Sequence, residues 1–141
     1  MSIWKMPLTI EDVNNRSANT AVEHLGIIFS AFTENSLSAT MPIDHRTCQP
    51  LGLLHGGISA ALAETVASSA ANYCVDQREA YCVGLDINAN HIRGITSGIV
   101  TATASPFHLG KSTQVWEVRI VDQAQRLICI ARMTMAVIRR S

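Results

Sequence analysis

The segment from Ser59 to Cys74 constrains the fold most, because it is a long uninterrupted run of mostly Ala, Ser and Leu with a single charged residue, Glu64. These residue types favour or tolerate a helix, and no Pro or Gly breaks the run. The Gly56-Gly57 pair directly upstream marks a turn that leads into it. The sequence therefore predicts a long helix whose small side chains allow a sheet to approach closely on most sides.

Strand-like patterns flank this helix on both sides. Before it, the apolar stretches 27–32 and 37–41, separated by a polar turn at 34–36, predict a hairpin. After it, Val83, Leu85, Ile87 and Ala89 alternate with polar residues or glycine, which is typical of a half-buried strand. Three more strands are expected at 99–105, ended by Pro106, at 115–121 and, after a turn at 122–126, at 127–138.

Two short helices are expected near the N-terminus. Thr9 and Asp12 have the spacing of a capping box, which predicts a helix over 10–15, and a second turn is expected at 21–25 before Gly26. The main order is thus two strands, one long helix and four strands. Antiparallel strands wrapped around that helix form an α+β domain, the order of the hotdog fold. No repeat or linker divides residues 1–141, so we expect a single domain.

Composition narrows the possible partners. With 48% hydrophobic and 16% charged residues, the 141-residue chain is more apolar than a lone small domain needs, which suggests burial against a sister subunit. Eleven basic and eleven acidic residues balance, and the only basic cluster is Arg139-Arg140, so nucleic acid is not expected as a partner. The stretch 47–74 carries a single formal charge, but glycines, His55 and Glu64 interrupt it, which argues against a membrane span.

The cysteines and histidines predict neither a disulfide framework nor a metal centre. The four cysteines show no CxxC spacing, and the N-terminus lacks a signal peptide pattern, so a reduced, cytoplasmic protein is expected. The five histidines have no HxxxH pairing and no cysteine partners of the kind that zinc requires, so no metal is expected. A Ser-His-Asp hydrolase is disfavoured because the sequence has no G-x-S-x-G elbow.

Glu64 is the first candidate catalytic residue. A carboxylate within an otherwise uncharged helix either points to water or lies in a low-dielectric site, where its pKa rises toward the range of a base or nucleophile. Ser68, four residues later, shares the same helical face and can reach the same substrate or water. The simpler alternatives are a solvated stripe for Glu64 and a merely tolerated small residue for Ser68.

The start of the helix is the second candidate. Free N–H groups at a helix N-terminus form an oxyanion site, and the glycines at 56 and 57 leave room for a thioester carbonyl. His55 can orient that carbonyl or the leaving thiolate, or it can simply satisfy loop backbone groups. Gln49, in the preceding loop, can hold a water or a carbonyl with its amide, although most loop glutamines are only hydrated.

Two later segments combine basic and hydrogen-bonding groups. One is Asn90 to Arg93 at the end of the first strand after the helix, and the other is Phe107 to Ser112 between the next two strands. Such loops suit phosphate or nucleotide groups, and the alternative is ordinary solvated surface charge.

Taken together, these motifs resemble the hotdog acyl-CoA thioesterases over nearly the whole chain. The resemblance rests on the run from Gln49 through His55-Gly56-Gly57 to Glu64-Thr65, on the segment 84–93, and on 108–110. It is greatest for the bacterial branch that contains the 1,4-dihydroxy-2-naphthoyl-CoA thioesterase of menaquinone synthesis and the proofreading thioesterase of enterobactin synthesis. Two positions differ: Leu51 stands where Phe is usual, and Gly94 where Pro or Ser is usual.

The resemblance implies an activity and a role for each motif. Glu64 would be the nucleophile or general base, assisted by Gln49, His55 and Ser68, with the Gly56 N–H polarising the thioester carbonyl. The substrate would be an aromatic acyl-CoA, with no cofactor other than the coenzyme A of the substrate. Active sites would lie at the subunit interfaces of a homotetramer, a dimer of dimers. The residues expected to contact the CoA nucleotide are His91, Ile92, Arg93, Gly94, His108, Leu109, Gly110, Lys111 and Ser112.

Three other functions remain compatible with the sequence. A proofreading thioesterase would use a misloaded aryl or acyl carrier protein in place of an acyl-CoA. A non-hydrolytic acyl-CoA-binding protein or a hotdog dehydratase would use the same helix and cavity without hydrolysis. Dehydratases of this fold generally rely on a catalytic histidine, whereas this helix carries Glu64.

Overall fold

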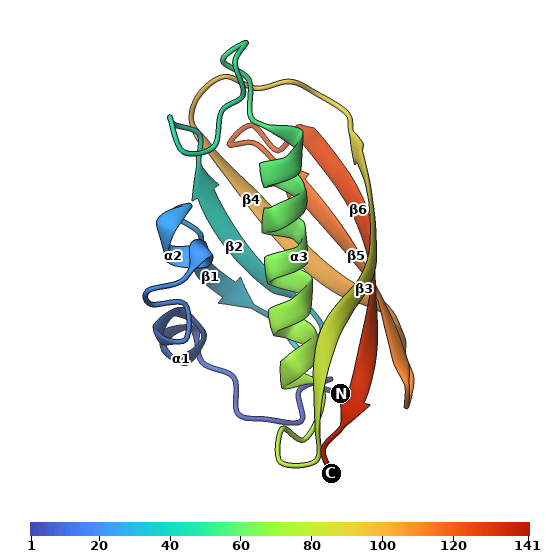
Figure 1. Cartoon of the computed structure of the whole chain (residues 1–141). Coiled ribbons are helices and arrows are strands. Elements are labelled where there is room, and N and C mark those ends of the chain that lie inside the picture. Colours follow the sequence, from blue (N-terminus) through green and yellow to red (C-terminus); the bar gives the residue numbers. More distant parts are fainter.

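The computed structural model describes all 141 residues as one six-stranded antiparallel sheet curved around a central helix (Figure 1). The strand order across the sheet is β1-β2-β4-β5-β6-β3, so the two strands at its edges are β1 and β3. This confirms the expected hotdog architecture. The elements are α1 (Ile10–Asn15), α2 (Ala21–His24), β1 (Ile28–Phe32), β2 (Leu37–Pro42), α3 (Gly56–Tyr73), β3 (Ala80–His91), β4 (Ile99–Leu109), β5 (Thr113–Val121) and β6 (Leu127–Arg139).

The central helix α3 begins earlier than the sequence suggested. Gly56 and Gly57 belong to its first turn rather than to a preceding turn, because His55 caps the helix: the Gly57 N–H donates to His55 Nδ1 at 2.8 Å. The side of α3 that faces the sheet is lined by small residues with no exposed surface, including Ala63, Ala67 and Ala70. A larger residue at such a position would overpack the core, typically at a cost of about 1–3 kcal/mol.

A bulge in β3 changes which residues face the helix. The register with β6 shifts between Gly84 and Asp86, so Cys82 and Gly84 face α3 before the bulge, and Ile87 and Ala89 turn inward after it. The expected strict alternation was therefore wrong in its first half: Val83 and Leu85 are 43% and 62% exposed. Both lie on an edge strand that pairs only with β6.

Strand β4 is longer than predicted, because Pro106 does not end it. β4 pairs with β2 only as far as Ala104, so no neighbouring strand on that side requires the N–H that proline lacks. A register shift between Pro106 and His108 accommodates the ring on the β5 side. As a result His108 and Leu109 lie in a strand, and only residues 110–112 form the connection that was expected to span 107–112.

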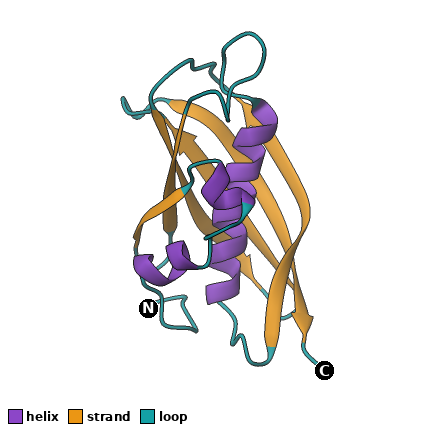
Figure 2. Ribbon diagram, turned by 60° about the vertical axis from the view of Figure 1, so that its left-hand side comes forward, coloured by secondary structure: helices purple, strands orange, loops and turns teal.

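The N-terminal helices α1 and α2 lie beside α3, on the side away from β3 (Figures 1 and 2). Thr9 caps α1 as expected, because its hydroxyl accepts from the Asp12 N–H at 3.0 Å. The Asp12 carboxylate does not complete the capping box; it accepts a hydrogen bond from the Tyr73 hydroxyl at 2.5 Å, which ties α1 to α3. None of the helices combines the length and the apolar character that crossing a membrane requires.

Candidate active site

Glu64 lies in the middle of α3 on the exposed side of the helix. It lines a cavity of about 420 Å³ together with Ala61, Thr65, Ser68, Ser69 and Val22 of α2. Ser68 is therefore on the same face and in the same cavity, as the four-residue spacing predicted. Because Glu64 is exposed in the single chain, a low-dielectric setting for this carboxylate stays a prediction for an assembled form.

Gly84 of β3 makes room for the Glu64 carboxylate. A Cβ atom added at position 84 would lie 2.7 Å from Glu64 Oε2, closer than real contacts allow. The Glu64 carboxylate thus lies directly against β3, next to the bulge. Gly84 was not among the predicted site residues, although a glycine inside an alternating strand is the usual signal for a bulge or a close approach.

The start of α3 presents one unpaired backbone N–H. The N–H groups of Ile58 and Ser59 donate to the His55 carbonyl, and that of Gly57 donates to His55 Nδ1. The Gly56 N–H has no acceptor within the chain. Because Nδ1 accepts a hydrogen bond, the neutral imidazole of His55 carries its proton on Nε2, which makes Nε2–H a further donor near the start of α3.

The Gln49 side chain stabilises the loop that precedes α3. Its side-chain oxygen accepts from the N–H groups of Leu51 and Leu53, so its NH₂ group is the part left to face a ligand. At the tip of the same loop, the Leu51 side chain is 82% exposed. Gln49 is therefore a hydrogen-bond donor in this arrangement rather than an acceptor.

A second cavity, of about 270 Å³, joins the start of α3 to the end of β3. It brings together two groups of residues that the sequence predicted separately, the catalytic candidates Gln49 and Gly56 and the nucleotide-binding segment. The His91 ring lies against the helix start, with Nε2 2.9 Å from the point where a Cβ of residue 56 would be. The predicted residues that line this cavity are Gln49, Gly56, His91, Ile92, Arg93 and Gly94.

The other predicted nucleotide-binding segment lies at the opposite end of α3. Gly110 and Lys111 line a cavity of about 290 Å³ with Lys5, Cys74 at the C-terminal cap of α3, and Arg139. His108 packs against Gly110, and the Ser112 carbonyl accepts from the Val137 N–H at 2.9 Å. Within one chain, the structure therefore does not bring His108 to Ser112 together with His91 to Gly94.

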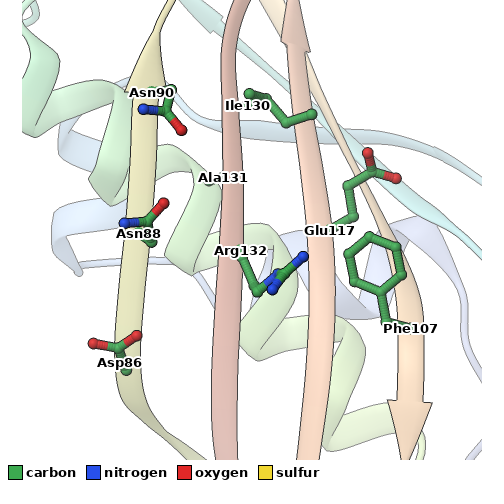
Figure 3. Close-up of a pocket in the computed structure, with 8 residues that line it drawn as sticks. All are labelled: Asp86, Asn88, Asn90, Phe107, Glu117, Ile130, Ala131 and Arg132. Atoms are coloured by element: carbon green, nitrogen blue, oxygen red, sulfur yellow. The ribbon is translucent and has the colours of Figure 1, made fainter.

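The largest cavity, of about 520 Å³, is not beside Glu64. It lies on the outer face of the sheet, with α3 behind the strands (Figure 3). Its side chains include Asp86 and Glu117, and the Arg132 guanidinium lies 5.4 Å from the centroid of the Phe107 ring. Of the two segments predicted to bind a nucleotide it contains only Asn90 and Phe107, and none of the predicted catalytic residues lines it.

Glu64 and Gly56 line different cavities of the same chain. They are eight positions apart along the helix, which is about 12 Å at the usual rise per residue. The cavity around Glu64 and the cavity around Gly56 have no lining residue in common. One chain therefore offers the carboxylate and the oxyanion donor at separate positions along α3.

Comparisons with known proteins agree on one family. A family model described as the thioesterase superfamily matches residues 51–129. A proofreading thioesterase, EntH of Cronobacter sakazakii, is 45% identical over 96% of this chain and 98% of its own. Crystal structures of a mutant thioesterase from Pseudomonas aeruginosa and of a thioesterase from Haemophilus influenzae superpose with TM-scores of 0.97 and 0.95. The first is 48% identical over 99% of this chain and 100% of that chain, and the second is 50% identical over 97% and 95%.

Proposed function

Because the chain belongs to the thioesterase superfamily, and is thus a hydrolase acting on thioesters, we propose that its substrate is an acyl-CoA with an aromatic acyl group, such as benzoyl-CoA or 1,4-dihydroxy-2-naphthoyl-CoA. The products would be the free acid and coenzyme A. The naphthoyl substrate would place the reaction in menaquinone synthesis. The observation that carries the proposal is the Glu64 carboxylate, which lies over Gly84 in an open cavity.

The chemistry requires a nucleophile and a donor for the developing oxyanion. In one route Glu64 takes a proton from water, the hydroxide adds to the carbonyl carbon, and the C–S bond breaks as the thiolate leaves and is protonated. In the other, a Glu64 oxygen attacks the carbon, the thiolate leaves, and water then hydrolyses the mixed anhydride. In both routes the Gly56 N–H binds the oxyanion. His55 Nε2–H and the Gln49 NH₂ group orient the thioester, and Ser68 holds the water.

We propose that each site combines residues of two chains. Since Glu64 and Gly56 of one chain line separate cavities, the Gly56 donor of one chain would act with the Glu64 carboxylate of its partner. Strand β3 has a free edge that carries the exposed side chains of Val83 and Leu85, and an edge of this kind favours pairing with a second copy. Pairing there would place the partner beside Glu64, which lies over this strand.

Two such dimers would form the proposed homotetramer through another surface. The outer face of the sheet carries both signs of charge, on Asp86, Glu117 and Arg132, around the largest cavity. A tetramer would also bring the segments 91–94 and 108–112 of different chains together around the CoA nucleotide. Light scattering during gel filtration measures the oligomeric state directly.

We also propose that the enzyme works in the cytoplasm, a reducing compartment in which its four free cysteines would stay reduced.

An acyl carrier protein is the second candidate substrate. The relative named a proofreading thioesterase is 45% identical over nearly the whole of both chains, which favours this alternative specifically. Comparing turnover of the same aryl group on coenzyme A and on a carrier protein decides between the two. A higher kcat/KM for the carrier-bound thioester would replace acyl-CoA as the substrate.

The test of the catalytic assignment is the variant E64Q. Gln is nearly isosteric with Glu, so the fold should stay intact, while thiol release from benzoyl-CoA, followed with DTNB, should fall by about a thousandfold. Near-normal turnover by this variant would refute the role of Glu64. Binding of benzoyl-CoA to E64Q, measured by calorimetry, should persist.

A further inference from the structure

The cavity at Glu64 continues into a second one along α3. The second cavity, of about 320 Å³, lies between α3 and the α1–α2 segment. Val22, Ser68 and Ser69 line both cavities, which makes them one trough. The trough runs from Glu64 to Tyr73, a distance of about 13 Å at 1.5 Å per helical residue. The remaining residues of the second cavity are Val13, Arg16, Ser17, Thr20, Asn72 and Tyr73.

The outer wall of this trough is held firmly in place. Besides the bond from Tyr73 to Asp12, the Arg16 guanidinium lies 5.3 Å from the centroid of the Tyr73 ring. The Asn14 side chain accepts from the Phe29 N–H at 2.8 Å and donates to the Phe29 carbonyl at 3.0 Å. Because α1 is fixed to both α3 and β1, the wall can limit the size of a ligand rather than yield to it.

The polar groups along the trough are largely satisfied within the protein. The Asn72 amide donates to the carbonyls of Ser68 and Cys82 and accepts from the Cys82 N–H. The Thr65 hydroxyl donates to the Ala61 carbonyl at 2.7 Å. The hydroxyls of Thr20 and Ser17 likewise donate to backbone carbonyls. The Arg16 guanidinium pairs with the Asp12 carboxylate at 3.3 Å. Beyond Glu64, and apart from the Ser68 and Ser69 hydroxyls, a ligand therefore meets satisfied polar groups and apolar surface, which suits an uncharged chain.

We propose that the trough holds the distal part of a medium-length acyl chain, and that Val22 lines the passage through which this chain enters the second cavity. The inference rests on the proposed function, since it assumes that the thioester carbonyl lies at Glu64. An extended chain with bonds of about 1.5 Å advances roughly 1.3 Å per carbon, so the trough accommodates about ten carbons. A benzoyl group fills only the part beside Glu64. Val22 lies where the two parts join.

The experiment compares two substrates across matched variants. V22F places a ring where the two cavities join, and V22A removes two methyl groups there. A21F is the control, because Ala21 is the neighbouring residue of α2, is exposed, and lines neither cavity. The values of kcat/KM for benzoyl-CoA and decanoyl-CoA are measured by thiol release, and thermal melting checks that each variant is folded.

We expect V22F to lower kcat/KM for decanoyl-CoA by about tenfold or more beyond any change that it causes in kcat/KM for benzoyl-CoA. A21F should resemble the wild type on both substrates. V22A should keep decanoyl-CoA activity, because the smaller side chain leaves the passage open. An equal loss on both substrates with V22F, or no loss on either, overturns the inference.

Further results distinguish a failure of this inference from a failure of the proposed function. If V22F does not fold, the smaller enlargement V22L decides, and a loss on decanoyl-CoA no larger than that on benzoyl-CoA overturns the inference. Loss of all turnover in E64Q, combined with no chain-length effect at Val22, removes only the inference. A wild-type protein without acyl-CoA hydrolysis, or a fully active E64Q, removes the proposed function itself.

Discussion

Replacing Gly56 by proline removes the backbone N–H from the proposed site while keeping the helix. Gly56 is the first residue of α3, a position that proline favours, and its N–H has no acceptor to lose. The preceding residue, His55, has φ −67° and ψ 126°, the extended conformation that a following proline requires. The variant G56P should therefore fold with α3 intact.

Alanine at the same position provides the matched control. Either substitution adds a Cβ that would lie 2.9 Å from His91 Nε2, so both force this flexible ring to move by a similar amount. Only proline also removes the N–H, because its ring Cδ takes the place of that hydrogen. Loss of one oxyanion donor costs about 3 kcal/mol, a factor of roughly 10² in kcat.

The assay is thiol release from benzoyl-CoA by G56P and G56A, with circular dichroism to compare their helix content. We expect the kcat of G56A to be about a hundredfold higher than the kcat of G56P. Equal kcat values for the two folded variants would show that the Gly56 N–H does not bind the oxyanion. The His91 contact would then be the remaining explanation for any shared loss.

Three other predictions follow from individual contacts. In G84A the new Cβ would lie 2.7 Å from Glu64 Oε2, so the displaced carboxylate should lower kcat by about a hundredfold with little change in Tm, as thermal melting and thiol release will show. Burial raises the pKa of Cys74 to about 12 and that of Cys82 to about 11, so both should resist DTNB at pH 8 in the native protein and react after denaturation; rapid native labelling would contradict their burial. The Arg46 hydrogen bonds lower the pKa of Asp44 from 3.8 to about 2, so this pair stabilises the fold above about pH 4 and the effect is lost as the pH falls toward 2. Acid unfolding of D44N should lack that component.

The helix and the order of the strands were predictable because their signals are local. An Ala-rich run without proline or glycine forms a helix in many contexts, and the small buried residues Ala63, Ala67 and Ala70 show why the sheet can close around it. The four-residue spacing of Glu64 and Ser68 likewise fixed their common face. These features depend on neighbours in the sequence, which one chain is enough to reveal.

The errors came from features that depend on distant partners. Pro106 was expected to end a strand, and it does not, because β2 stops short of it. The bulge at Gly84 depends on the pairing with β6, so period two alone placed Val83 and Leu85 on the wrong side. The role of Gly84 is visible only once Glu64 lies against it. The segments 91–94 and 108–112 are far apart in one chain, so their joint role is a property of the proposed assembly.

Mixing two inactive variants tests the two-chain site most directly. E64Q and G56P are each purified, mixed, dissociated and allowed to reassociate, and thiol release from benzoyl-CoA is measured before and after. If Gly56 of one chain acts with Glu64 of its partner, random pairing restores one intact site in each mixed dimer, about a quarter of wild-type activity. Activity that stays at the level of the separate variants, in a sample shown by mass spectrometry to contain mixed dimers, would contradict the account.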